Sequence, residues 1–338
     1  MTTVTGARFG RYREEYLPAI LEVVERSVVD AGLVGSSIAE MLDYQMETGG
    51  KRLRAVLPLM VADVLGVEPG DVVPFGAACE LIHNATLVHD DLQDGDKLRR
   101  GEPTIWSRYG AERAINLGDA ILYLAPRCLD YLDVEADRRW EVASRMYRYV
   151  LGVIDGQERE FALEFSSASR EDYDRMVVGK TSGLFALPIV GAAQLCGADA
   201  GMLEALEEAS HHLGVLFQIQ DDIVDVYGEK GRENPGGDLR EGKISALVVA
   251  FRDRAPEAEV EKLGEILRRD REATSLEDVA WARERFRIRG ALDDALEAIE
   301  DRRRRALDIE SLTEHKAFRD LIGGLIDVFL GPIDNIIR

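Results

Sequence analysis

Apolar residues recur every three or four positions along almost the whole of this 338-residue sequence. This spacing predicts amphipathic helices, because it places the apolar side chains on one helix face. The alternation typical of half-buried strands is nearly absent, so we expect an all-α fold, a large antiparallel helical bundle with a central active-site cavity. The segments with helical spacing are residues 17–31, 36–46, 52–65, 71–94, 111–133, 138–163, 171–196, 201–227, 242–252, 257–268, 277–308 and 315–337.

Short clusters of Gly, Pro and Asp separate these segments, for example at residues 49–50 and 67–70. None of the clusters has the Pro- and Ser-rich composition of a linker between domains. An all-helical protein of this length can enclose one large core. We therefore expect a single domain over residues 1–338.

Acidic residues outnumber basic residues by 63 to 42, which gives a formal net charge of -21. Such a surface repels nucleic acid and anionic membranes, so we expect no nucleic-acid partner. A site for an anionic ligand must then be a local exception where basic side chains gather.

The three cysteines, Cys79, Cys128 and Cys196, are far apart and form no CxxC pair. They are typical of reduced thiols in a cytoplasmic protein. The first residues lack the basic start and apolar run of a signal peptide, and no later apolar run reaches membrane-spanning length. We expect a cytoplasmic protein with no integral membrane segment.

Two DDxxD motifs, at residues 90–94 and 221–225, each fall near the C-terminal end of a long helical segment. A single motif in so acidic a chain would indicate only a solvated helix end, but both copies are embedded among apolar residues. Carboxylates at this spacing repel one another and converge on one side of a helix, so a cation should compensate them. Mg²⁺ prefers oxygen ligands and bridges carboxylates to phosphates. The predicted metal ligands are Asp90, Asp91, Asp94, Asp221, Asp222 and Asp225.

Two basic segments break the acidic character of the chain. GGKRLR at residues 49–54 places three cations at the start of a helix, where backbone NH groups also favour anions. LRRGEPT at residues 98–104 places two arginines just beyond the first DDxxD motif. Because arginine binds phosphate oxygens in pairs, these segments indicate a diphosphate site.

With these motifs together, the chain resembles the trans-isoprenyl diphosphate synthases, the polyprenyl synthetase family, and most of all its short-chain geranylgeranyl diphosphate synthases. The matching motifs occur in the family's order over most of the chain. They are GGKRLR at 49–54, HNATLVHDDLQDGDKLRRGEPT at 83–104, GQ at 156–157, KTSGLF at 180–185, FQIQDDIVD at 217–225 and GGDLREGK at 236–243.

The resemblance implies two substrates, isopentenyl diphosphate and an allylic diphosphate (dimethylallyl, geranyl or farnesyl), in a fold of the isoprenoid synthase type. The six aspartates would hold two or three Mg²⁺ ions on the allylic diphosphate, and the chain would be a homodimer. The implied ligands of isopentenyl diphosphate are Lys51, Arg54, His83 and Arg100. The implied helpers at the allylic diphosphate are Arg99, Lys180 and Lys243.

The reaction implied by the resemblance is ionisation, condensation and elimination. Metals and cations draw off the allylic diphosphate, the isopentenyl double bond attacks the carbocation, and the departing diphosphate takes the proton. A closed, water-poor cavity is needed because water would quench the cation. Thr181 and Gln218 would face the reacting carbon, beside Lys180 and Lys243.

The resemblance also implies that the growing tail runs beside the helix that carries the first DDxxD motif, so the residues that precede this motif would limit product length. A helical turn rises ~5.4 Å, about one isoprene unit, so a small residue there lets the tail pass. The small Ala85 predicts a product longer than farnesyl diphosphate, mainly geranylgeranyl diphosphate, with Thr86 beside it and Ile82 as a candidate floor. Farnesyl and C25 geranylfarnesyl diphosphate remain alternatives.

The chain departs from the family pattern in two places. Residues 233–235 read Glu-Asn-Pro where relatives carry Gly-Lys-Pro, so a cation is lost there or supplied by Lys230 or Arg232. After Lys243, the usual Thr-Leu-Pro becomes Ser-Ala-Leu at residues 245–247, which we expect to alter the helix start more than the chemistry.

Other functions fit less of the sequence. A class I terpene cyclase shares the bundle and one DDxxD motif, but not a second DDxxD motif with GGKR. A di-iron bundle is suggested by the ExxH spacing of Glu80 with His83 and Glu208 with His211, yet leaves the basic motifs unexplained. A silent partner subunit would not need intact aspartates. The arginines at 302–305 are most simply an exposed ion-pair face.

Overall fold

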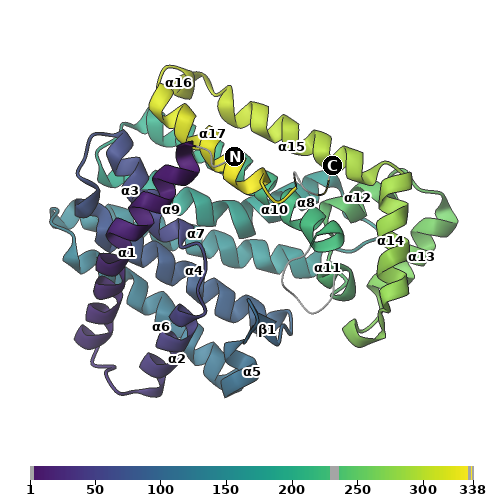
Figure 1. Ribbon diagram of the computed structural model, residues 1–338, viewed down its shortest axis with the longest axis horizontal. Coiled ribbons are helices and arrows are strands. Elements are labelled where there is room, and N and C mark those ends of the chain that lie inside the picture. Colours follow the sequence, from purple (N-terminus) through teal and green to yellow (C-terminus); the bar gives the residue numbers. More distant parts are fainter. Residues whose placement is uncertain (1–3, 229–235, 334–335, 337–338) are drawn as a thin grey trace.

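The structure is a computed structural model that describes residues 4–228, 236–333 and 336, most of which are helical (Figure 1). It confirms the expected all-α bundle. Residues Leu98–Arg99 (β1) and Glu102–Pro103 (β2) pair as a small antiparallel hairpin. The α-helices are α1 Val4–Asp30, α2 Ser37–Glu47, α3 Leu53–Val64, α4 Val73–Gln93, α5 Ile105–Tyr109, α6 Ala111–Arg127, α7 Ala136–Ala162, α8 Arg170–Val177, α9 Gly183–Leu195, α10 Ala200–Tyr227, α11 Gly237–Arg240, α12 Ala246–Arg252, α13 Glu257–Leu267, α14 Leu276–Ile288, α15 Ala291–Leu307, α16 Glu310–Thr313 and α17 Lys316–Leu330. Shorter helical turns are η1 Pro69–Val72, η2 Cys128–Tyr131, η4 Arg271–Ala273 and the π-helical η3 Val178–Ser182.

Several helix boundaries differ from the sequence pattern. Helix α1 begins at Val4 instead of residue 17, because its first turns pack against α17. The expected segment 277–308 is two helices, α14 and α15, separated at Gly290, whose φ of +76° favours glycine. The expected segment 171–196 is interrupted by the π turn η3.

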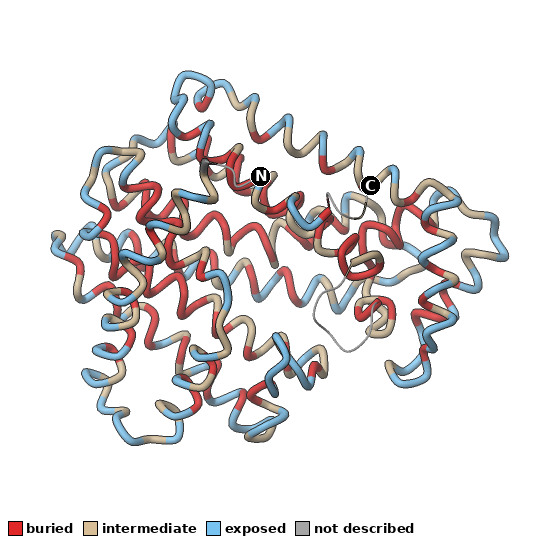
Figure 2. Tube along the Cα trace, viewed as in Figure 1, coloured by how far each residue is buried: buried red, intermediate tan, exposed pale blue. Residues whose placement is uncertain are grey.

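Helices α4, α9 and α10 form the centre of the bundle. Helix α4 packs against α3 and α6, and α10 packs against α9 and α15. Figure 2 shows that buried residues concentrate in these middle helices, whereas the outer helices alternate between buried and exposed positions. Both DDxxD motifs therefore lie at the ends of buried core helices. That the chain forms a single domain stays a prediction.

One helical stretch of the described residues, 170–195, is long and apolar enough to span a membrane. Its apolar window is 78% buried inside the protein. A helix that packs on all sides in a bundle must be apolar all round, so core packing accounts for this composition. The stretch contains α8, η3 and α9, which line the central cavity.

The arginines at 302–305 on α15 form ion pairs. Arg302 pairs with Asp174 on α8, and Arg303 lies 3.5 Å from Asp327 on α17. Arg304 and Arg305 both reach Asp301, at 2.5 and 2.7 Å. The run thus links α15 to its neighbours, as an ion-pair face predicts.

Candidate active site

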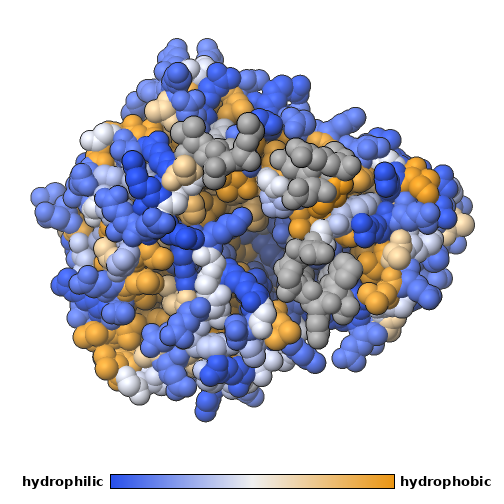
Figure 3. All heavy atoms as spheres, viewed as in Figure 1, coloured by the Kyte–Doolittle hydropathy of each residue, from blue (hydrophilic) through white to orange (hydrophobic). Residues whose placement is uncertain are grey.

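A cavity of about 620 Å³ opens between the central helices, at the place where Figure 3 shows the surface hollowed. Its walls come from the loop before α3 and from α4, α7, α10 and α17, together with α8, η3 and α9. Most of the expected site residues line it. These are Lys51, Arg54, His83, Thr86, Asp90, Asp94, Arg99, Arg100, Lys180, Thr181, Gln218, Asp221, Asp222 and Lys243.

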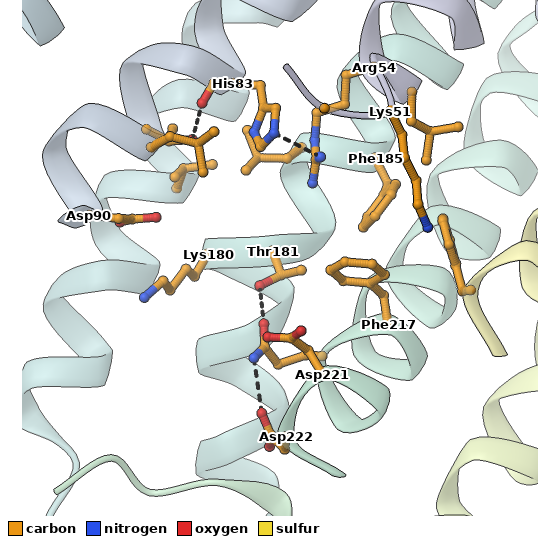
Figure 4. A pocket seen from close by; sticks show the side chains of 18 of the residues that line it. Lys51, Arg54, His83, Asp90, Lys180, Thr181, Phe185, Phe217, Asp221 and Asp222 are labelled. Atoms are coloured by element: carbon orange, nitrogen blue, oxygen red, sulfur yellow. Dashed lines mark hydrogen bonds between the residues drawn. The ribbon is translucent and has the colours of Figure 1, made fainter. Parts of the chain in front are cut away.

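Basic side chains line one end of the cavity. Arg54 Nη1 lies 3.3 Å from His83 Nε2, and its guanidinium lies 4.8 Å from the ring centre of Phe185 (Figure 4). Burial lowers the pKa of Arg54 to about 10, so it stays charged at neutral pH. Burial, followed by the charge of Arg54, lowers the pKa of His83 well below its usual value. This end of the cavity therefore presents the charged Arg54 beside the neutral imidazole of His83.

The paired glycines of GGKRLR are needed for close contact with Arg100. Arg100 Nη1 donates to the carbonyl oxygen of Gly49. A Cβ on Gly50, whose φ is +121°, would lie 2.7 Å from that guanidinium. The glycine pair thus lets the backbone pass under Arg100, which holds the loop against the cavity wall.

Acidic side chains line the other end. Asp90 and Asp94 come from α4, and Asp221 and Asp222 come from α10. Burial raises the pKa of Asp90, and the charge of Lys180 opposes that effect. The buried Asp90 carboxylate therefore favours a nearby cation, which a metal ion would supply.

Lysines compensate part of this acidity. Lys243 Nζ donates to Asp94 Oδ2 at 2.7 Å and also lies 2.8 Å from Glu241 Oε2. Burial alone would lower the pKa of Lys243, but the surrounding carboxylates, Asp94 first, raise it well above its usual value. Lys180 Nζ donates to Glu160 on α7. Both lysines therefore carry charge into the cavity.

Asp91 and Asp225, two of the six expected metal ligands, do not line the cavity. Asp91 is buried and accepts from Arg99 Nε at 2.6 Å, and burial raises its pKa to about 6. Asp225 Oδ2 accepts from the backbone NH of Asp238 at 3.0 Å. Here the two aspartates position neighbouring residues, and their metal ligation stays a prediction.

The acidic end fits Mg²⁺ although no ready-made cage is present. Within the described residues, no three His, Cys, Asp or Glu side chains are placed to hold a metal ion. Mg²⁺ uses one or two protein carboxylates and takes its other oxygens from water and substrate phosphates. Carboxylates that face one another from α4 and α10 suit this coordination.

A hydrogen-bond chain lies between the two ends. Thr181 Oγ1 donates to Gln218 Oε1 at 2.9 Å, and Gln218 Nε2 donates to Asp222 Oδ1 at 3.0 Å (Figure 4). Asp222 also accepts from the Tyr173 hydroxyl at 2.8 Å, and burial raises its pKa to about 7. The chain fixes the Gln218 amide oxygen toward the cavity.

The π turn η3 presents Lys180 and Thr181, and its position depends on two glycines. A Cβ on Gly156 would lie 2.1 Å from the backbone nitrogen of Lys180, and one on Gly179 would lie 2.9 Å from Gly156 Cα. The GQ motif therefore allows α7 to approach η3 closely, which brings Glu160 to Lys180. π turns of this kind often occur at functional sites.

Three aromatic rings from different helices meet at the cavity wall. Phe185, Phe217 and Phe329 have ring centres 5.1 to 5.2 Å apart. They come from α9, α10 and α17, so the C-terminal helix covers the centre of the cavity with apolar surface. Such a wall keeps water from the reacting carbons.

Some of these residues could be found only in the structure. Glu160, Tyr173 and Phe329 follow no spacing that links them to the motifs they contact. A carboxylate partner for Lys180 could be expected on charge grounds, but its place on α7 could not. The same holds for Arg271, which donates to the carbonyl of Asp94 at 2.8 Å across the loop that follows α4.

The expected chain-length residues divide between the cavity and the core. Thr86, one turn before Asp90, lines the cavity. Ala85 and Ile82 are 0% and 1% exposed and do not line it. Their effect on product length stays a prediction.

The two departures from the family pattern have different outcomes. Residues 233–235, Lys230 and Arg232 lie outside the described residues. Ser245 caps α12, because its hydroxyl accepts from the NH of Val248 at 3.3 Å. That residues 245–247 alter the helix start stays a prediction.

The ExxH pairs do not build a di-iron site in the described structure. Glu80 forms an ion pair with Arg52, and His83 contacts Arg54. Glu208 is exposed and His211 lies 3.9 Å from Glu207. The two pairs therefore lie in different environments, one among arginines beside the cavity and the other with an exposed glutamate.

Comparison with known proteins agrees with this geometry. A sequence model of the polyprenyl synthetase family matches residues 36–284. A geranylgeranyl diphosphate synthase of Mycobacterium tuberculosis is 38% identical over 221 residues, which are 63% of this chain and 62% of that protein. A short chain isoprenyl diphosphate synthase of Methanothermobacter thermautotrophicus is 30% identical over 91% of this chain and 94% of that protein.

Solved structures show the same likeness. A geranylgeranyl pyrophosphate synthetase from Pyrococcus horikoshii has a TM-score of 0.81 and 27% identity, and the alignment covers 96% of this chain and 98% of that one. A polyprenyl synthase from Caulobacter crescentus, complexed with calcium and isoprenyl diphosphate, has a TM-score of 0.84 and 25% identity over 96% and 97%. These findings confirm the resemblance read from the motifs: the chain belongs to the polyprenyl synthetase family and is a prenyltransferase.

Proposed function

We propose that the chain condenses isopentenyl diphosphate with an allylic diphosphate and makes mainly geranylgeranyl diphosphate. The observation that carries this proposal is the polarity of the cavity. One end gathers fixed cations beside His83, the other gathers aspartates from two facing helices, and apolar rings close the space between. This arrangement suits two diphosphates whose hydrocarbon parts meet in the middle.

The residues of this chain divide the reaction between them. Lys51, Arg54 and Arg100 bind the isopentenyl diphosphate, while Lys180 and Lys243 bind the allylic diphosphate and stabilise its charge as it departs. Thr181 and Gln218 present oxygens to the carbon that becomes positive, and the aromatic wall excludes water. The proton lost at the end passes to the departing diphosphate.

Two or three Mg²⁺ ions are proposed at the acidic end, held by Asp90, Asp94, Asp221 and Asp222. When bound, Mg²⁺ neutralises diphosphate charge and makes the diphosphate a better leaving group. The Caulobacter relative, complexed with calcium and isoprenyl diphosphate, supports the use of a divalent ion.

The proposed product length rests on relatives and on α4. Proteins that match this chain carry the names geranylgeranyl and short chain isoprenyl diphosphate synthase, and others carry the name farnesyl diphosphate synthase. Thr86, a small residue one turn before Asp90, lines the cavity where a growing tail would pass. We therefore place the usual stop at geranylgeranyl diphosphate.

We also propose a cytoplasmic homodimer in which α6 and α7 meet their copies. Soluble proteins rarely leave many large apolar side chains exposed on neighbouring surface unless a partner covers them. Those on α7 recur at spacings of seven, four and three, which places them on one face. The exposed members are Ile115 and Tyr123 on α6 and Trp140, Tyr147, Leu151, Ile154 and Phe161 on α7.

Light scattering on the purified protein tests the dimer. We expect Leu151→Arg to give a monomer, because a charge would be buried in the interface. Val34→Arg, a substitution at an exposed apolar residue outside α6 and α7, should leave a dimer. A monomeric wild type would contradict the proposal.

The reaction itself is tested with radiolabelled isopentenyl diphosphate and dimethylallyl, geranyl or farnesyl diphosphate, with and without Mg²⁺. Linear products that require Mg²⁺ and stop mainly at geranylgeranyl diphosphate are expected. Consumption of an allylic diphosphate without isopentenyl diphosphate would indicate a cyclase instead. No product with any primer would indicate a silent subunit.

A further inference from the structure

The loop that carries GGKRLR contains an unusual backbone conformation. Among the described residues, Arg52 and Arg100 alone combine a side chain with a positive φ, of 57° and 56°. Residues with a Cβ rarely adopt this region unless surrounding contacts hold them there. Both arginines lie at the cationic end of the cavity, and both side chains hold the same loop.

Arg52 is held by a buried ion pair. Its Nη1 donates to Glu80 Oε1 on α4 at 2.7 Å, and its Nη2 donates to the carbonyl of Met46 at the end of α2. The side chains of Arg52 and Glu80 are only 8% and 3% exposed. The guanidinium therefore joins α2, the loop and α4.

Glu80 is fixed from a second direction. Asn84 Nδ2 donates to Glu80 Oε1 at 3.2 Å, and Gln45 Nε2 donates to Asn84 Oδ1 at 3.4 Å. Glu80 also lies one helical turn before His83, so the network ties the loop to the helix that carries the imidazole. Such a buried network holds its members in one arrangement when every contact is made.

A carboxylate is unexpected among residues that attract a diphosphate. Coulomb repulsion from Glu80 opposes anion binding, so its presence needs another reason. Two buried nitrogen atoms near it, Arg54 Nε and His83 Nδ1, have no hydrogen-bond partner in the structure. Unsatisfied atoms of this kind indicate a site that a ligand or water completes.

We propose that Arg52 and Glu80 are positioning residues for the homoallylic diphosphate. Their ion pair holds residues 49–54 so that Lys51 and Arg54 face the diphosphate, and Glu80 itself makes no contact with it. This inference rests on the proposed function. It assigns to Arg52 a role different from that of its two basic neighbours.

The variant Glu80→Gln separates positioning from simple electrostatics, because the two predict opposite signs. Removing a negative charge from an anion site should lower the KM for isopentenyl diphosphate. If Glu80 positions the loop, the KM for isopentenyl diphosphate instead rises about tenfold, and that for the allylic substrate changes less than twofold. A lower or unchanged KM for isopentenyl diphosphate overturns the inference.

A second pair of variants tests whether the two residues act as one unit. Arg52→Gly removes the side chain where φ suits glycine, so the backbone is not strained and the loop loses only its anchor. The double variant should raise the KM no further than either single variant. Additive effects would show two independent roles and would also overturn the inference.

One control variant and one binding measurement distinguish the possible outcomes. Arg289→Ala breaks the Arg289–Glu259 pair, with contacts of 2.8 and 2.9 Å, away from the cavity and should leave both KM values unchanged. Calorimetry of isopentenyl diphosphate binding without metal supplies a readout apart from turnover. A wild type that binds no isopentenyl diphosphate refutes the proposed function, whereas equal binding by wild type and Glu80→Gln refutes only the positioning role. Should Glu80→Gln not fold, Asn84→Ala removes a neutral partner of Glu80, so electrostatics predicts an unchanged KM for isopentenyl diphosphate and the positioning role predicts a higher one.

Discussion

The two ends of the cavity are prepared for their diphosphates in different ways. At the cationic end, arginines are fixed by contacts within the protein, such as Arg52 with Glu80 and Arg100 with Gly49. At the acidic end, burial raises the pKa of Asp90, and lysines only partly offset the carboxylates. The first end is ready for an anion without help, and the second needs added cations. The comparison shows that one cavity can bind two similar diphosphates in two ways, one through fixed arginines and the other through added cations.

Removing divalent metal should give the largest effect. With EDTA, we expect condensation and binding of the allylic diphosphate to fall below detection, because the two lysines at the acidic end only partly offset its carboxylates. Binding of isopentenyl diphosphate should change less than twofold. Isothermal calorimetry of each substrate, with and without Mg²⁺, measures both. Equal loss of the two affinities would break the comparison.

Substitution of a single carboxylate at the acidic end should give the next largest effect. Asp90→Asn is expected to lower kcat by about 100- to 1,000-fold, a magnitude typical for loss of one group that stabilises transition-state charge. Steady-state kinetics over a range of Mg²⁺ concentrations measures it. Asp155→Asn, at an exposed acid on α7, serves as the control and should behave as wild type.

At the cationic end, Arg54→Gln should raise the KM for isopentenyl diphosphate by about 10- to 100-fold, because hydrogen bonds to charged groups are worth ~1.5–3 kcal/mol. The kcat and the Mg²⁺ requirement should remain. Arg148→Ala, at a residue 63% exposed, is the control. If Arg54→Gln altered the Mg²⁺ dependence, the two ends would not be independent.

A substitution on α4 should change the product more than the rate. Thr86→Phe places a ring in the cavity one turn before Asp90, so we expect mainly farnesyl diphosphate. Ala85→Phe should instead overpack a fully buried position and lower stability by about 1–3 kcal/mol. Product chromatography and thermal unfolding separate the two. An Ala85→Phe protein that is stable and shortens the product would place the tail along Ala85.

The smallest effect concerns Glu241, next to Lys243. Burial raises its pKa from 4.5 to about 7, so the folded state binds this proton more tightly than the unfolded state. The resulting stabilisation is complete below about pH 4.5 and is lost as the pH rises through about 7. Glu241→Gln mimics the protonated form, so without metal at pH 8 its Tm should exceed that of wild type by about 2–4 °C. At pH 5 the difference should nearly vanish, whereas Glu272→Gln, at an exposed acid, should show no such pH dependence.

Features that depend on residues close together in the sequence could be predicted. Features that depend on contacts between distant segments could not. The DDxxD motifs lie on helix ends as expected, because three- and four-residue spacing is a property of the helix itself. The same geometry explains why not all six aspartates share one direction: neighbours such as Asp90 and Asp91 point about 100° apart, so Asp91 meets Arg99 instead of the cavity. Contacts such as Lys180 with Glu160 depend on how helices distant in sequence pack, which no short motif records.

The residues of the cavity wall are spread along the chain, from Phe9 on α1 to Phe329 on α17. During synthesis on the ribosome, both aspartate motifs therefore emerge before the helix that supplies Phe329. A chain stopped before α17 would carry the proposed metal-binding aspartates but would lack Phe329 from its apolar wall. In the proposed reaction, the apolar wall that Phe329 completes would therefore be among the last parts of the cavity to be synthesised.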